Sequence, residues 1–73
     1  MFPNLEAEQA RSGHTNEYVA RELSLLRQSY EHKKKTGGFK LIEINRILEI
    51  YNAKFEYLFA PEAKPPAPQA AAI

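Results

Sequence analysis

The sequence predicts an all-α fold, and three observations support that prediction. The clearest is an apolar pattern at helical spacing, at Leu41, Ile44, Ile47, Leu48 and Tyr51, which is typical of a helix with one buried face. The segment from Thr15 to Phe39 divides into two shorter helical patterns around a tight turn. Gly13 and Asn52, which are residue types that commonly end helices, follow the first expected helix and the Leu41–Tyr51 segment. Together these features indicate a chain of short helices.

The first helix is expected from about Leu5 to Ser12, with Asn4 as its cap and Gly13 as its stop. Two glutamates lie in its first turns, where the positive end of the helix dipole favours them. The residues of this segment that we place in the core are Phe2, Leu5 and Ala10.

Two further helices are expected around the turn Ser24-Leu25-Leu26. Thr15 can cap the first through its hydroxyl, and its apolar stripe consists of Val19, Ala20 and Leu23. The second would run from about Arg27 to Lys35, with Tyr30 turned inward and polar residues turned outward. Outward-facing Gln, Ser, Arg and His suit a groove of donors and acceptors better than a hydrophobic partner. This is the layout of a helix-turn-helix whose second helix reads DNA.

The end of the chain changes character in two steps. Asn52 stands where a left-handed helix stop is needed, and a last apolar turn or short helix follows, with Phe55, Leu58 and Phe59. From Ala60 the composition changes to Pro and Ala, and its prolines cannot sit in a continuing helix. We therefore expect one domain over residues 1–60 and a disordered Pro/Ala-rich tail over residues 61–73.

Length and composition exclude several classes of protein. A chain of 73 residues holds one small domain, in which an enzyme cleft with its own supporting shell is hard to build. There is no cysteine, and His14 and His32 lack the spacing of metal ligands. We expect a binding module with no metal and no cofactor. No apolar run approaches the roughly 20 residues that span a bilayer, and no secretion signal is recognisable, so we expect a cytoplasmic protein with no membrane partner.

The charge is unevenly distributed although the net charge is only +1. Five basic residues fall close together around the second helix of the pair, namely Arg27, Lys33, Lys34, Lys35 and Lys40. Acidic residues gather in the first helix and in the last third of the chain. The pattern favours one positive face. The alternative is that the three consecutive lysines form a solvated helix end, which the helix dipole stabilises.

With these residues placed, the chain resembles the phage-type Cro and repressor helix-turn-helix proteins of the xenobiotic-response-element family. The resemblance covers about Met1 to Phe59. Its carrying segments are Phe2-Pro3-Asn4-Leu5, residues 15–20 with Leu23, residues 27–31 with residues 33–37, Phe39, Ile44, and residues 55–59. It implies a compact, lambda-repressor-like bundle of five helices. It also implies that the start of the second helix touches phosphate, that the third helix lies in the major groove, and that a homodimer occupies a pseudo-palindromic operator.

Carried onto this sequence, the DNA contacts of the family fall on seven residues: Asn16, Arg27, Gln28, Ser29, His32, Lys33 and Lys35. Asn16 matches the position at a helix start that bonds a phosphate. Gln28 is expected to read a base, since its amide can donate to and accept from adenine at once. Lys33 and Lys35 are expected to pair with backbone phosphates. The alternative for Gln28 and Ser29 is plain exposed polar surface.

The chain departs from the family pattern at several positions. Ser24 stands in the turn where the family has Gly, so that either the backbone is strained or the turn differs. Leu26 replaces the Ser or Thr cap before the reading helix. Lys40 and Lys54 stand where capping hydroxyls precede the last two helices. Glu31 adds a negative charge to the reading helix, which either accepts from a cytosine amino group or repels phosphate.

Two functions follow from these features. The first is a small sequence-specific transcription regulator that occupies a double-stranded DNA operator. The second is an antirepressor-type interaction protein that binds a partner repressor through a surface containing Leu25 and Leu26. An enzyme is not expected, because the histidines and serines assemble no nucleophile with a base. For a homodimer, an aromatic patch of Tyr51, Phe55 and Phe59 is one candidate contact, and the alternative is that all three complete the core.

Overall fold

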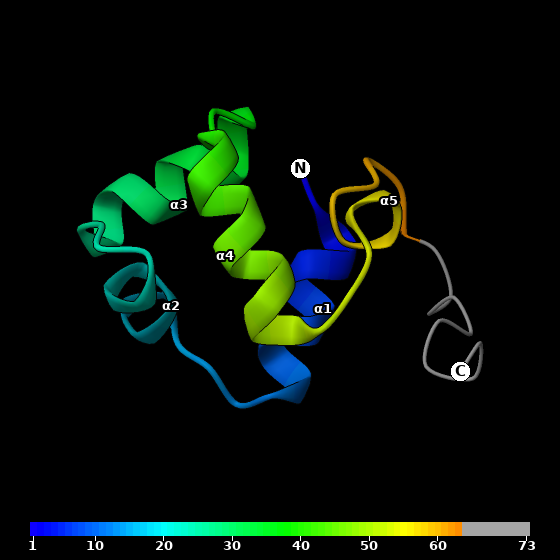
Figure 1. Ribbon diagram of the computed structural model, residues 1–73, viewed down its shortest axis with the longest axis horizontal. Helices are drawn as coiled ribbons and strands as arrows, with labels where there is room; N and C mark the ends of the chain where they lie inside the picture. The colour runs from blue at the N-terminus through cyan, green and yellow to red at the C-terminus, as the bar shows by residue number, and fades with distance from the viewer. Residues whose placement is uncertain (64–73) are drawn as a thin grey trace.

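Five helices make up the structure, a computed structural model that describes residues 1–63 (Figure 1). The helices are α1 (Pro3–Arg11), α2 (Asn16–Glu22), α3 (Arg27–Thr36), α4 (Leu41–Tyr51) and α5 (Phe55–Leu58). No strand occurs in this part of the chain, so the prediction of an all-α fold is confirmed there. Residues 61–63 are exposed and outside any helix. The rest of the expected tail, residues 64–73, lies outside the described residues.

Helix α1 begins earlier than the sequence pattern indicated. Pro3 occupies its first turn, where a fixed φ and a missing N–H suit a helix start. The prediction that Asn4 caps this helix is wrong, because Asn4 lies inside it, buried, and its amide donates to the carbonyl of Tyr57 at 2.9 Å. Gly13, with φ +71°, follows the end of the helix as predicted. The hydrogen bond between Asn4 and Tyr57 links α1 to the last helix of the domain.

The core face of α1 is confirmed in part. Leu5 is fully buried and Phe2 packs against the core. The prediction that Ala10 is buried is wrong. Ala10 lies five positions after Leu5, which turns it about 140° away around a helix of 3.6 residues per turn. Gln9, four positions after Leu5, is buried in its place.

Helices α2 and α3 meet at a tight turn and pack against each other (Figure 1). The hydroxyl of Thr15 accepts a hydrogen bond from the Tyr18 N–H at 3.0 Å, so the predicted cap is confirmed. Ser24 adopts φ +60°, the left-handed conformation that glycine adopts without strain. Leu26 occupies the N-cap position of α3 and provides no side-chain hydrogen bond. Tyr30 is fully buried, as predicted.

Helix α4 contributes four apolar or aromatic side chains to the core. Ile47 is fully buried, and Ile44, Leu48 and Tyr51 pack around it. The prediction that Leu41 is buried is wrong, because this side chain is 73% exposed. Leu41 lies at the first turn and about 120° around the helix from Ile47, so that no neighbouring element covers it.

Helix α5 closes the domain against α1. Asn52 ends α4 in the left-handed conformation, with φ +47°, as predicted. The Tyr57 hydroxyl donates to Glu8 at 2.8 Å, and Leu58 is fully buried. The ring of Phe59 lies edge-on to that of Phe2, with centroids 5.1 Å apart. These contacts leave α2 and α3 at the opposite side of the molecule from α5 (Figure 1).

Candidate nucleic-acid interface

Helix α3 carries four of the seven candidate DNA contacts as exposed side chains: Arg27, Gln28, His32 and Lys35. We call these four residues the α3 outer face. Tyr30 and Lys34 are buried on the side of the helix that faces away from Gln28, His32 and Lys35. Arg27 lies within about 60° of both buried residues around the helix axis and is exposed at the first position of α3. Ser29 lies between the two sides and is partly buried. The α3 outer face therefore combines two basic side chains with an amide and an imidazole.

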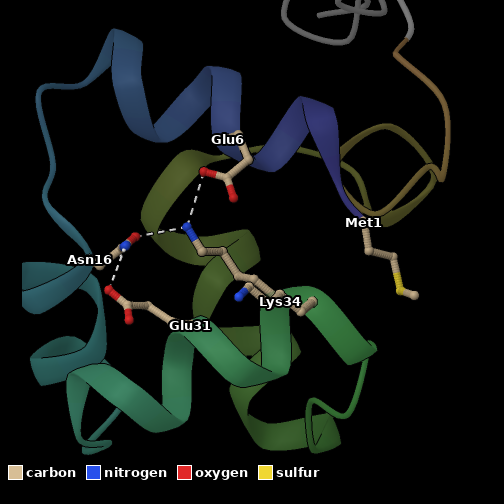
Figure 2. A pocket seen from close by; sticks show the side chains of 6 residues that line it. Met1, Glu6, Asn16, Glu31 and Lys34 are labelled. Carbon is tan, nitrogen blue, oxygen red and sulfur yellow. Dashed lines mark hydrogen bonds and ion pairs between the residues drawn. The ribbon is translucent and has the colours of Figure 1, made fainter.

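Asn16 is engaged with other side chains of the protein (Figure 2). Its Nδ2 donates to Glu31 Oε2 at 3.0 Å. Its Oδ1 accepts from Gln9 Nε2 at 2.9 Å and from Lys34 Nζ at 2.7 Å. The amide at the start of α2 thus links α1, α2 and α3.

Lys34 is a buried lysine, only 6% exposed, so it does not belong to the positive face that the sequence predicts. Besides Asn16, its ammonium contacts Glu6 Oε1 at 3.0 Å and Gln9 Oε1 at 3.4 Å. It also lies 4.8 Å from the centroid of the Tyr30 ring, within the range of a cation–π contact. The signal in the sequence was its spacing, because Lys34 follows the inward Tyr30 by one helical turn.

Tyr30 joins the buried side chains around Lys34. Its hydroxyl donates to Gln9 Oε1 at 2.7 Å. Burial raises the pKa of the Tyr30 phenol strongly, and the nearby Tyr51 and Glu6 add to the rise. The phenol therefore remains a neutral donor at any ordinary pH. Glu6, Gln9, Asn16, Tyr30, Glu31 and Lys34 form the network that we call the Lys34 cluster.

Lys33 is turned towards α4. Its Nζ lies 2.9 and 3.2 Å from the two carboxylate oxygens of Glu43. Glu43 also accepts a hydrogen bond from the backbone N–H of Lys40 at 2.9 Å. Burial alone would raise the pKa of this carboxyl group, but the hydrogen bonds from Lys40 and Lys33 outweigh it and lower the pKa. Lys33 thus joins α3 to the start of α4.

Glu31 stands beside the α3 outer face. Its side chain is 39% exposed, and its Oε2 lies 3.9 Å from Arg27 Nε, four positions earlier on the helix. The same oxygen accepts the hydrogen bond from Asn16. The exposed side of α3 is therefore basic with one fixed carboxylate.

The turn before α3 has a partly apolar surface. Leu26 is 75% exposed, whereas Leu25 packs against the core, so only Leu26 of the predicted pair is exposed. A hollow of about 310 Å³ lies beside the turn, lined by Glu17, Arg21, Ser24, Leu25, Leu26 and Arg27. An apolar group of a partner could contact Leu26 here.

The three aromatic residues considered for a homodimer contact have different surroundings. Phe59 is buried, and Phe55, which is 50% exposed, stacks on it. The Tyr51 hydroxyl lies 3.0 Å from His14 Nδ1. Burial raises the pKa of Tyr51 to about 12, with Tyr18 and Glu8 contributing. Most of this group completes the core, and Phe55 is its exposed member.

Within residues 1–63, no group of three His, Asp or Glu side chains is arranged to hold a metal ion. In the same range, none of the helices has the length and apolar character needed to cross a membrane.

No protein-family model, curated protein or solved structure matches this chain. The geometry of α3 and its neighbours is therefore the basis for assigning a function.

Proposed function

We propose that this protein is a small, lambda-repressor-like helix-turn-helix regulator that binds double-stranded DNA and acts by occupying an operator. In this proposal α2 and α3 form the motif, and α3 lies in the major groove. The observation that carries it is the α3 outer face: four polar side chains stand exposed on a helix that the buried Tyr30 anchors to the core.

The chemistry of this face suits base edges and phosphates. The Gln28 amide can bond adenine through one donor and one acceptor, and the Arg27 guanidinium can donate to guanine. His32 lies one turn after Gln28 on the same side of the helix and extends the same row. Lys35, near the end of α3, suits a phosphate, which contributes affinity without sequence information.

Two of the seven candidate residues have a different part in this proposal. Lys33 is held by Glu43, and Asn16 is held by the Lys34 cluster. Both side chains therefore support the position of α3, and we assign the direct contacts to Arg27, Gln28, His32 and Lys35. Ser29, partly buried, lies beside them.

The proposal is tested by selecting bound DNA from a random pool with the full chain, followed by titration of the selected and random sequences. Gln28→Ala is expected to weaken the selected site by about 1 to 3 kcal/mol and to leave random DNA unaffected. Lys35→Gln is expected to weaken both alike and to reduce the salt dependence. Asn45→Ala, which removes an exposed amide from α4, is the matched control. Equal losses on both DNAs for Gln28→Ala would contradict base reading.

A second candidate function is supported by the exposure of Leu26 beside the hollow at the turn. An antirepressor-type protein would bury this leucine against a partner repressor. Leu26→Ser should then abolish the complex with the repressor, whereas a DNA-binding regulator should retain its operator. Selection of a defined DNA sequence by the chain alone would count against this second function.

A further inference from the structure

The carboxylate of Glu31 is the one acidic group on α3. It borders a polar hollow of about 350 Å³ between α1, α2 and α3, lined by Met1, Glu6, Asn16, Glu31, Lys34 and Lys35 (Figure 2). A freely moving carboxylate on this surface would only repel phosphate. The contacts of Glu31 indicate that it does not move freely.

The side chain of Asn16 holds Glu31 in one orientation. Lys34 Nζ and Gln9 Nε2 are both donors, at 2.7 and 2.9 Å from Asn16 Oδ1. An ammonium and an amide N–H cannot accept hydrogen bonds, so the oxygen of Asn16 must face them. The amide nitrogen is thereby directed at Glu31 Oε2, 3.0 Å away.

The orientation of Asn16 is itself fixed by a buried side chain, Lys34. Lys34 is buried and also bound to Glu6 on α1 at 3.0 Å. Glu31 is therefore the outer end of a chain of hydrogen bonds that starts inside the protein. Of its two oxygens, Oε2 is occupied by Asn16, and Oε1 accepts no hydrogen bond from residues 1–63. The side chain remains 39% exposed.

We propose that Glu31 is a specificity-determining residue that accepts a hydrogen bond from the exocyclic amino group of a cytosine in the major groove. The proposal rests on the proposed DNA-binding function. Cytosine presents a donor there, guanine presents two acceptors, and thymine presents an acceptor, so a carboxylate is attracted to the first and repelled by the other two. Adenine offers an amino group next to an acceptor nitrogen, which a carboxylate disfavours.

Fixing the carboxylate before binding strengthens its contact with the cytosine. A side chain that is already held loses less conformational freedom when the base arrives. In this arrangement Asn16 is a positioning residue that acts on the base through Glu31. Its removal is expected to weaken the cytosine preference without changing the affinity for random DNA.

The test uses the full chain and a selected DNA site, in two arms. In the first arm, selection from a random pool is repeated with the wild type, Glu31→Gln, and Glu17→Gln as control. Glu17 is exposed in the first turn of α2, so its substitution removes the same charge without touching the Lys34 cluster. The wild type and Glu17→Gln are expected to select cytosine at one position. For Glu31→Gln, the preference for cytosine over the other bases at that position is expected to be about tenfold weaker.

The second arm changes the DNA, so its main result comes from the wild-type protein. The selected cytosine is replaced by 2-pyrimidinone, which lacks the exocyclic amino group. Affinity of the wild type is expected to fall about tenfold, and affinity of Glu31→Gln is expected to change by much less. Binding of selected DNA with no cytosine position dependent on Glu31 would overturn this inference and leave the proposed function standing. Failure of the wild type to bind any DNA would overturn both.

Discussion

Lys33 on α3 and Glu43 on α4 form a largely buried ion pair, with the ammonium 2.9 and 3.2 Å from the two carboxylate oxygens. Their side chains are 17% and 7% exposed. The backbone N–H of Lys40 donates to the same carboxylate. The end of the DNA-facing helix proposed here is thus tied to the start of α4.

Stability should fall in acid because of this pair. The pKa of Glu43 is lowered in the folded protein from an ordinary value of 4.5. A lowered pKa means that its stabilisation is complete above about pH 4.5 and is lost as the pH falls through the folded value. Urea unfolding of the wild type and Glu43→Gln between pH 7 and pH 3 measures this. The difference between the two proteins should shrink towards pH 3.

The control for this titration is Glu62→Gln, which removes an exposed carboxylate outside the helices. Its unfolding free energy should follow that of the wild type at every pH. A constant difference between wild type and Glu43→Gln over the whole range would refute the proposed linkage.

Leu26→Ser should stabilise the protein. The N-cap position of α3 lacks a side-chain hydrogen bond, and Leu26 is 75% exposed. A serine there can accept from a free N–H of the first turn, which contributes about 1 kcal/mol. Thermal and urea unfolding measure the gain. Leu41→Ser removes an equally exposed leucine that is not a cap, and a similar gain in that variant would show that capping is not the cause.

Ser24→Gly should also stabilise the protein, through the backbone. Ser24 has φ +60°, and a left-handed conformation costs a residue with a Cβ about 1 kcal/mol relative to glycine. The greater flexibility of glycine in the unfolded chain offsets part of this gain. Ser12→Gly is the comparison, because Ser12 has φ −82° and glycine should destabilise it. A loss of stability in both variants would mean that the turn carries no strain.

Lys34→Met should destabilise the protein by about 1 to 3 kcal/mol, because Asn16 and Gln9 lose a buried donor. Glu6 is 55% exposed on its side chain, so water can replace the lost ammonium there. Lys35→Met, one residue later and exposed, should change the unfolding free energy by less than about 0.5 kcal/mol. Equal effects in urea unfolding would argue against the Lys34 cluster as a stabilising network.

The helix pattern of this chain could be predicted because it depends on local chemistry. Thr15 caps its own helix, Gly13 and Asn52 adopt left-handed conformations, and Tyr30 is buried. Such preferences act within a few residues of sequence. The errors occurred at Ala10, which is turned about 140° from Leu5 on its helix, and at Leu41, which lies in the first turn of α4 where no neighbouring element covers it.

The surroundings of the candidate interface could be predicted less well, because they depend on tertiary contacts. The exposure of Gln28 and His32 followed from the position of Tyr30 on the same helix, because both lie about 160° from it around the helix axis. The partners of Asn16 and Lys33 could not be derived in this way. Asn16 contacts residues from α1 and α3, and Lys33 contacts α4, so their roles depend on how separate helices pack.

Lys34 also fixes the rotation of α3 about its own axis. Turning this helix by a single residue step, about 100°, would carry the ammonium away from Glu6 and Asn16, which are anchored on α1 and α2. Slippage of α3 would therefore break the ion pair with Glu6 and leave Gln9 and Asn16 without their donor. A lysine hidden from solvent thus decides which side chains the helix shows to its surroundings.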